Sequence, residues 1–225
     1  IRTEIEEVDA VRAILDQAAG IDTSASDAGP LVLLNANCSD LLPLRAWPRD
    51  RYIELAKKLL ARDPSLRIGF TGAPAEAPGA EEMVATIGDP RCFILAGRTS
   101  LRQLIVLYGL ADLLVTNDSG PAHFASLTTI DVITLFGPEH PKLFAARGAR
   151  NHVLHAGLAC SPCVSALNNR TTPCRDNLCM QAITVDEVFE TTLRVLDARQ
   201  RGDQPLPVLE IETSSIDLGR ATPVR

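Results

Sequence analysis

Short apolar segments alternate with amphipathic segments along the middle of this 225-residue chain, and this alternation limits the possible folds more than any other feature. The apolar segments are rich in β-branched and large aliphatic residues, which is typical of buried strands. Strands are expected at residues 31–37, 66–72, 92–97, 113–115 and 131–137. Strands that alternate with helices form parallel βαβ units with right-handed crossovers. The sequence therefore predicts an α/β fold with a doubly wound, Rossmann-like parallel sheet.

Helix signals separate these strands. Helices are expected at residues 4–18, 48–62 and 80–87, after the caps Ser100 and Thr184, and from Pro121. Gln103 follows Ser100 by three residues and completes a capping box. We expect three regions: an amphipathic helix and interdomain linker at 1–29, one Rossmann-like domain at 30–199, and a loosely ordered tail at 200–225. Residues 138–157 are expected to be irregular, with a short apolar piece at 152–155.

Small or polar residues follow each of the five expected strands. They are Asn37, Gly72, Gly97, Asp118 and Gly137. The carboxyl ends of parallel strands lie along one edge of the sheet, and open α/β sheets bind their ligands there. Glycine often follows a strand for structural reasons alone, so the joint pattern counts for more than any single position. We predict a binding crevice at this edge.

The segment from Leu113 to Ser126 carries the strongest of these signals. Asp118, Ser119 and Gly120 form a turn between a strand and a helix, where Ser or Asp can cap the helix. Backbone amides at a helix start suit a phosphate, Asp118 could accept hydrogen bonds from sugar hydroxyls, and His123 lies one turn into the helix. The alternative is a plain helix cap with an incidental histidine. A serine hydrolase is disfavoured because the glycines of the nucleophile elbow are absent around Ser119.

Two further side chains at the expected edge fit a nucleotide. Arg45 could neutralise phosphate, and Glu76 could accept hydrogen bonds from ribose hydroxyls. The alternatives are a surface arginine and a solvated carboxylate. Neither the Gly-x-Gly-x-x-Gly fingerprint nor a Walker A motif occurs, which disfavours an ordinary dinucleotide oxidoreductase and a P-loop enzyme.

Composition excludes several other classes. The net charge of −6 and the pI near 5.2 argue against a general nucleic-acid binder. No apolar run approaches the length of a membrane span, and the amino-terminal segment is acidic and amphipathic, unlike a secretion signal. We therefore expect a cytoplasmic protein.

The six cysteines are consistent with a reducing compartment. Four of them have a spacing near that of zinc ligands: Cys160, Cys163, Cys174 and Cys179. Only the first pair has the usual two-residue spacing, so packed thiols, or a disulfide under oxidation, are favoured over zinc. We expect no metal and no cofactor, and we expect Cys38 and Cys92 to be buried small hydrophobes.

Several short motifs together resemble glycosyltransferase family 9, the ADP-heptose:lipopolysaccharide heptosyltransferases. They are RAWP at 45–48, TGAPAE at 71–76, AGRTSL at 96–101, NDSGPAH at 117–123, LFGP at 135–138 and Cys-Met at 179–180. The resemblance spans about residues 30–198. The basic residue Arg45 stands where the best-known members have Lys, and the loop before it is longer than theirs.

The resemblance implies the GT-B arrangement of two Rossmann-like domains, of which this chain matches the carboxyl-terminal, donor-binding one. The residues expected to bind the donor are Asn37, Ser39, Arg45, Glu76, Asp118, Ser119, Gly120 and His123. In this assignment Arg45 contacts the diphosphate, Glu76 the ribose and Asp118 the sugar. Asn37 and Ser39 share a phosphate-facing loop, and the adenine lies near residues 96–101.

The resemblance further implies inverting transfer of heptose from ADP-heptose to a lipopolysaccharide core or related glycolipid. The general base and the acceptor site are expected in an amino-terminal domain outside this chain, so no catalytic residue is assigned here. Peripheral association with the inner membrane is an additional expectation. The alternative function is a non-catalytic module that binds a nucleotide sugar.

Overall fold

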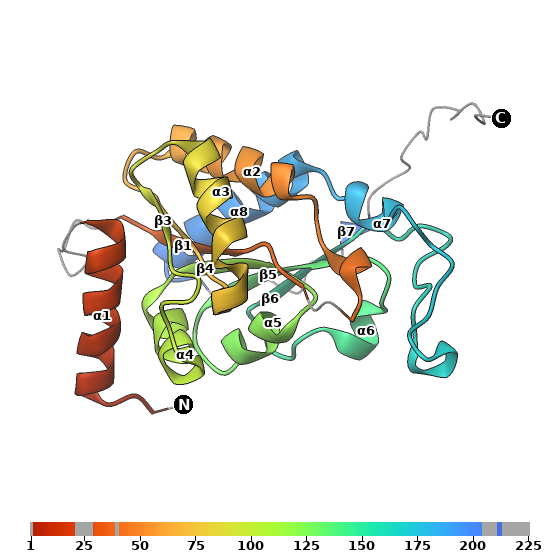
Figure 1. Ribbon diagram of the computed structural model, residues 1–225, viewed down its shortest axis with the longest axis horizontal. Helices are drawn as coiled ribbons and strands as arrows, with labels where there is room; N and C mark the ends of the chain where they lie inside the picture. The colour runs from red at the N-terminus through yellow and green to blue at the C-terminus, as the bar shows by residue number, and fades with distance from the viewer. Residues whose placement is uncertain (1, 21–28, 39–40, 204–210, 213–225) are drawn as a thin grey trace.

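The computed structural model describes the chain except residues 1, 21–28, 39–40, 204–210 and 213–225 (Figure 1). Its centre is a seven-stranded sheet in the order β3-β2-β1-β4-β5-β6-β7, with every neighbouring pair parallel. The strands are β1 Leu31–Asn35, β2 Arg67–Phe70, β3 Cys92–Ile94, β4 Leu113–Asn117, β5 Asp131–Phe136, β6 Asn151–His155 and β7 Ile211–Glu212. The predicted doubly wound parallel sheet is confirmed.

The strand order reverses between β1 and β4, which lie side by side at the centre of the sheet. Leu34 of β1 pairs with Phe70 of β2 on one side and with Val115 of β4 on the other. Such a reversal leaves a crevice outside the carboxyl ends of the two strands, because the following connections leave in opposite directions. The topology thus places the loop after β1 next to the turn after β4.

Helices cover both faces of the sheet (Figure 1). The α-helices are α1 Ile5–Ala19, α2 Arg49–Arg62, α3 Ala77–Ile87, α4 Leu101–Leu110, α5 Gly120–Ala125, α6 Pro141–Phe144, α7 Leu178–Gln181 and α8 Val185–Gln200. Short 3-10 helices occur at η1 Pro43–Arg45, η2 Pro74–Glu76 and η3 Ala166–Asn168. The predicted caps are present, since Ser100 accepts from the Gln103 amide and Thr184 from the Glu187 amide. None of the helices in the described ranges combines the length and apolarity that a bilayer crossing requires.

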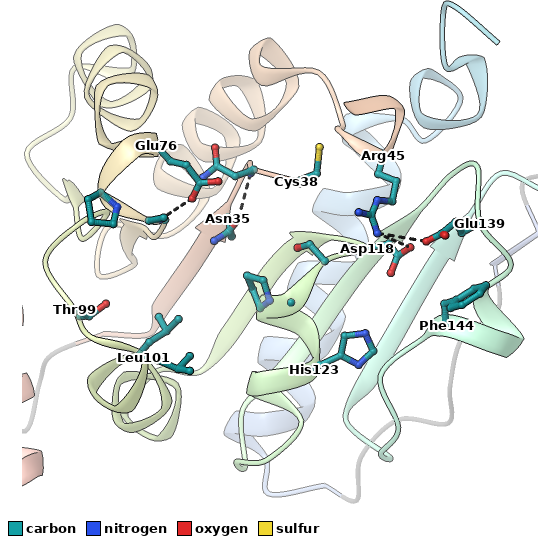
Figure 2. A pocket seen from close by; sticks show the side chains of 18 of the residues that line it. Asn35, Cys38, Arg45, Glu76, Thr99, Leu101, Asp118, His123, Glu139 and Phe144 are labelled. Carbon is teal, nitrogen blue, oxygen red and sulfur yellow. Dashed lines mark hydrogen bonds and ion pairs between the residues drawn. The ribbon is translucent and has the colours of Figure 1, made fainter. Parts of the chain in front are cut away.

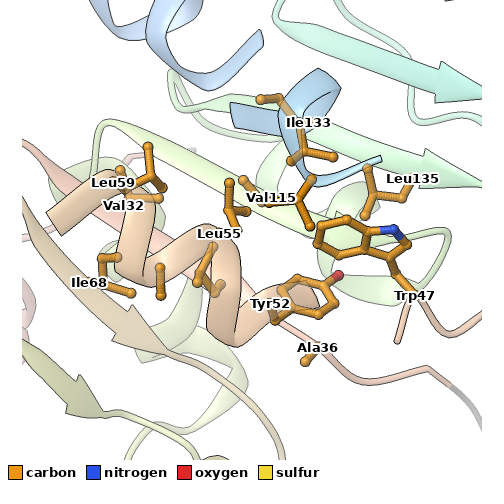
Figure 3. Packing of buried hydrophobic residues seen from close by; sticks show 14 of the residues in the cluster. Val32, Ala36, Trp47, Tyr52, Leu55, Leu59, Ile68, Val115, Ile133 and Leu135 are labelled. Atoms are coloured by element: carbon orange, nitrogen blue, oxygen red, sulfur yellow. The ribbon is translucent and has the colours of Figure 1, made fainter. Parts of the chain in front are cut away.

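The core consists of two apolar layers, one on each face of the sheet. Residues of α2, α3 and α8 pack on one face, and residues of α1, α4 and α5 pack on the other. In the first layer Trp47 and Tyr52 are fully buried and meet edge to face, with ring centroids 5.0 Å apart (Figure 3). Trp47 belongs to the loop that joins β1 to α2 and Tyr52 belongs to α2, so the pair anchors this loop in the core next to the carboxyl edge.

The chain after β5 differs from the sequence-based expectation. Residues 138–157 were expected to be irregular, but they contain α6 and the strand β6, which pairs with β5 along its whole length. The apolar signal of β6 is weak because its buried Asn151 and His152 pack in a polar network, with Thr134 and Asp131 as partners. The expected tail contributes the two-residue strand β7, and its other residues from 204 onward lie outside the described part.

Candidate functional site

A cavity of about 530 Å³ opens at the carboxyl edge of the sheet, where the connections after β1 and β4 leave in opposite directions (Figure 2). We call it the carboxyl-edge pocket. Seven of the eight residues predicted to bind a donor line it: Asn37, Arg45, Glu76, Asp118, Ser119, Gly120 and His123. The eighth, Ser39, lies outside the described residues. The predicted crevice therefore exists, and the described candidates meet in it.

Arg45 reaches the pocket because a buried asparagine fixes its loop. The Oδ1 atom of Asn117 accepts hydrogen bonds from the Trp47 amide at 3.0 Å and from the Tyr52 hydroxyl at 3.2 Å. Its Nδ2 atom donates to the Asn37 carbonyl at 3.1 Å. Asn117 ends β4, so these bonds tie the loop after β1 to the central strand. Arg45 is thereby held next to the carboxyl ends of β1 and β4, where the strand order reverses.

Arg45 lies between two buried carboxylates (Figure 2). Its Nη1 atom is 3.3 Å from Glu139 Oε2 and 3.8 Å from Asp118 Oδ2. Arg170 Nε lies 3.8 Å from the other Glu139 oxygen. Asp118 and Glu139 are 4% and 2% exposed. Burial, and next the neighbouring Glu139 carboxyl group, raise the pKa of Asp118 to about 7, although Arg45 opposes the shift.

The opposite wall of the pocket carries Glu76. Its Oε2 atom accepts a hydrogen bond from the Ala73 amide at 2.6 Å. A Cβ atom on Gly72 would lie 2.9 Å from Asn37 Nδ2 and 3.0 Å from Glu76 Oε2. The absence of a side chain at Gly72 thus lets Asn37 and Glu76 approach each other, and their polar groups line one side of the cavity.

The turn after β4 has the predicted position but a different hydrogen-bond pattern. Ser119 precedes α5 without capping it through its side chain, because its hydroxyl donates to the Asn117 carbonyl at 3.2 Å. The helix has only six residues, so its dipole is weak. An anion in the pocket would therefore depend mainly on Arg45, with the exposed His123 on α5 as a second nitrogen group.

Part of the segment expected near the adenine lies at the pocket. Thr99, Ser100 and Leu101 line the pocket, and Leu101 is exposed there, whereas Ala96 is buried in the core. Its neighbour Gly97 has a left-handed φ of +73°, and a Cβ atom on it would lie 3.1 Å from Pro74 Cα. A glycine is thus required where the loop after β3 passes the loop after β2.

Glu139, Phe144 and Arg170 also line the pocket, and the sequence analysis did not single them out. Glu139 directly follows the LFGP segment after β5, so the rule that strand ends gather at one edge could have found it. Phe144 belongs to the unexpected helix α6. Arg170 lies between the cysteines, far from any strand end, and no sequence signal singles it out.

None of the six cysteines, all of which lie in the described part of the chain, forms a disulfide. Within the described ranges no group of three or more His, Cys, Asp or Glu side chains is arranged to hold a metal ion. Burial raises the pKa of Cys179 to about 11 and that of Cys92 to about 12. Cys92 is buried as expected, but the expectation for Cys38 is wrong, because it is half-buried at the pocket wall.

Comparison with known proteins agrees with this geometry. A family model described as glycosyltransferase family 9 (heptosyltransferase) matches residues 4–172, which is most of the chain. The chain belongs to glycosyltransferase family 9. Its curated relatives include lipopolysaccharide heptosyltransferase 2 of Escherichia coli strain K12, with 32% identity over 102 residues, or 44% of this chain and 29% of the relative. The Salmonella typhimurium enzyme of the same name is 30% identical over 53% of this chain and 34% of its own length.

Solved structures of the family have the same fold as this family 9 chain. The E. coli ADP-heptose lps heptosyltransferase II superposes with a TM-score of 0.67 at 20% identity, covering 89% of this chain and 54% of that one. A family 9 glycosyl transferase from Veillonella parvula gives 0.70 at 18% identity, covering 87% and 53%. The E. coli heptosyltransferase WaaC with ADP gives 0.55 at 24% identity, covering 76% and 46%. This chain thus spans about half the length of these proteins.

Proposed function

We propose that this chain is the donor-binding half of a lipopolysaccharide heptosyltransferase and binds ADP-heptose in the carboxyl-edge pocket. The observation that carries the proposal is the meeting of Arg45, Glu76 and Asp118 in one cavity from three different loops. The curated relatives named above are heptosyltransferases, and solved relatives are described with ADP and with an ADP-linked fluoroheptose. These names support a heptose donor over other nucleotide sugars.

The pocket offers a separate group for each part of such a donor. Glu76 is placed to accept hydrogen bonds from the ribose, and the apolar Leu101 lies beside the space left for the base. Arg45 supplies the fixed positive charge that a diphosphate needs, and Asp118 faces the same space for the sugar hydroxyls. Asn37 lines the same pocket, and a phosphate contact of Ser39 stays a prediction.

The chemical role of this half would be to stabilise the leaving group. As the bond to the anomeric carbon breaks, negative charge grows on the departing nucleoside diphosphate. Arg45, His123, Ser119 and Gly120 line the pocket, and their cationic, imidazole and backbone amide groups would stabilise this charge. Groups held in place before the reaction stabilise the transition state without reorganising. No metal ion is needed in this scheme.

The remaining parts of the reaction are assigned outside residues 1–225. A general base there would deprotonate a hydroxyl of the lipopolysaccharide acceptor, which would attack the anomeric carbon with inversion. The cytoplasmic location and the peripheral membrane association implied by the resemblance stay predictions.

Calorimetric titration of the chain with ADP-heptose tests the proposal. We expect one molecule bound per chain, and at least a tenfold loss of affinity in Asp118→Ala, because the variant loses a buried polar partner of the ligand. The matched control is Glu81→Gln, which removes an exposed carboxylate on α3, away from the pocket lining. Absence of binding, or equal affinity in Asp118→Ala, would contradict the proposal.

The transferase step is tested separately with the full-length gene product. Incubation with ADP-heptose and a heptose-deficient lipopolysaccharide core should give a product heavier by one heptose, detected by mass spectrometry. A panel with ADP-glucose and UDP-glucose as donors should give slower transfer. Faster transfer from either glucose donor would refute the assignment of heptose as the donor sugar.

A further inference from the structure

Glu139 is a buried carboxylate whose position is fixed by the backbone around it. The preceding carbonyl, that of Pro138, accepts hydrogen bonds from the amides of Cys163 and Val164, both at 3.0 Å. Gly137 is packed so closely that a Cβ atom on it would lie 2.4 Å from Met180 Sδ. The carboxylate is only 2% exposed, so it stays at the pocket wall.

The pocket corner around Glu139 brings two carboxyl groups and two guanidinium groups together. Arg45 is shared between Glu139 and Asp118, and Arg170 approaches Glu139 from the loop after η3. Arg45 Nε, Asp118 Oδ2 and Glu139 Oε1 are buried and have no hydrogen-bond partner within the described part of the chain. The three residues line the carboxyl-edge pocket, and their unpartnered atoms form an incomplete polar cluster at its wall.

The charge of this corner conflicts with a diphosphate when both carboxyl groups are ionised. Two carboxylates then offset the two guanidinium groups, and the same Arg45 nitrogen that they contact must also attract the ligand. Like charges within a few ångströms in a buried site disfavour each other strongly, so one proton is held by such a pair. An incoming diphosphate adds negative charge and strengthens this effect.

We propose that Glu139 is a positioning residue of the donor site, which holds Arg45 beside Asp118 and makes the Asp118–Glu139 pair retain one proton when a nucleoside diphosphate sugar binds. The inference rests on the proposed function, because it concerns the same pocket. In the complex the shared proton frees Arg45 for the diphosphate. It also lets Asp118 act as a hydrogen-bond donor as well as an acceptor toward the ligand.

In the free pocket the Asp118–Glu139 pair is already able to take up this proton near neutral pH. The pKa of Asp118 is raised to about 7 by burial and by Glu139, so near neutral pH the pair is only partly protonated. The other charged groups lining this part of the pocket are Arg45 from η1, Arg170 from the loop after η3 and His123 from α5. Donor binding should therefore take up protons at pH 7 to 8, and affinity should fall as the pH rises.

Calorimetric titration with ADP-heptose in two buffers of different ionisation enthalpy measures this uptake directly. The diphosphate of ADP-heptose is a diester and has no proton of its own to exchange near pH 7. We expect close to one proton taken up at about pH 8. Affinity should be about thirtyfold lower at pH 8.5 than at pH 6, which follows from one linked proton and the raised pKa of Asp118.

Three variants assign the proton to the pair. Asp118→Asn, which copies the protonated form in shape, should bind at pH 8 without proton uptake. Glu139→Gln should move the midpoint of the pH dependence down by about one unit, because the like charge is gone. His123→Gln should bind more weakly but keep both the midpoint and the uptake, which excludes the imidazole as the proton acceptor.

Binding of ADP-heptose with no proton uptake and the same affinity from pH 6 to 8.5 would overturn this inference and leave the proposed function standing. So would an Asp118→Asn variant that fails to bind at every pH while retaining its fold by circular dichroism. No binding of ADP-heptose to the wild-type chain would instead refute the proposed function, and this inference with it.

Discussion

Replacing Asp118 by Asn should stabilise the free protein, although the residue belongs to the proposed binding site. The folded chain holds this carboxyl group 4% exposed, next to Glu139, and its pKa is raised from 3.8 to about 7. An acid whose pKa is higher in the folded than in the unfolded state lowers the free energy of unfolding as the pH rises. The loss begins above about pH 4, grows up to about pH 7 and is then constant. Asn carries no charge and avoids it.

The size of the effect follows from the shift. A difference of about three pKa units, at about 1.4 kcal/mol each, corresponds to about 4 kcal/mol at pH 8. At pH 5 only the part of the difference between 3.8 and 5 is expressed, somewhat more than one unit, which corresponds to about 2 kcal/mol. The variant should therefore gain more over the wild type at pH 8 than at pH 5.

Urea unfolding followed by far-UV circular dichroism at both pH values measures these gains. The Glu81→Gln variant is the control, since it removes an exposed carboxylate that lies on α3. A gain that does not depend on pH, or an Asp118→Asn variant less stable than the wild type at pH 8, would refute the electrostatic reasoning.

Three more substitutions test how the pocket is built. Arg45→Met should lower the affinity for ADP-heptose about tenfold to a hundredfold, measured by calorimetry, because a hydrogen bond between charged groups contributes about 1.5–3 kcal/mol; an unchanged affinity would remove Arg45 from the site. Asn117→Ala should cost about 3 kcal/mol in urea unfolding, because the Trp47 amide and the Tyr52 hydroxyl lose their buried acceptor; a cost below about 1 kcal/mol would contradict this. Gly97→Ala should lower the stability by about 1–2 kcal/mol, since the left-handed φ and the close approach to Pro74 disfavour a side chain; an unchanged melting temperature would show that the loop adjusts freely.

The parts of the fold that sequence reasoning predicted are those with strong local signals. The strands β1, β2, β4 and β5 are uniformly buried, and the helices α4 and α8 begin with capping boxes that are visible in the sequence. The strand β6 was missed because two of its five residues, Asn151 and His152, are polar, and their buried side chains contact Thr134 and Asp131 of β5. That pairing is a tertiary property, and no local pattern contains it.

The residues of the candidate site likewise include some that the sequence located and some that only the structure revealed. Asp118 directly follows β4, and Glu76 lies in the short 3-10 helix η2 after β2, so the rule that strand ends gather at one edge located both residues. The pairing of Arg45 with Glu139 joins residues that are 94 positions apart. It depends on the order of the strands in the sheet, which local sequence patterns do not determine. The raised pKa of Asp118 follows from burial and from the neighbouring Glu139 carboxyl group, so it too required the structure.

A crystal structure of the chain with ADP-heptose is the most direct test of the central claim, that the carboxyl-edge pocket holds the donor. We predict density for the diphosphate within hydrogen-bond distance of the Arg45 guanidinium and for the ribose against Glu76, with the heptose facing Asp118. A nucleotide bound elsewhere on the chain, or in the pocket with its diphosphate away from Arg45, would contradict the account.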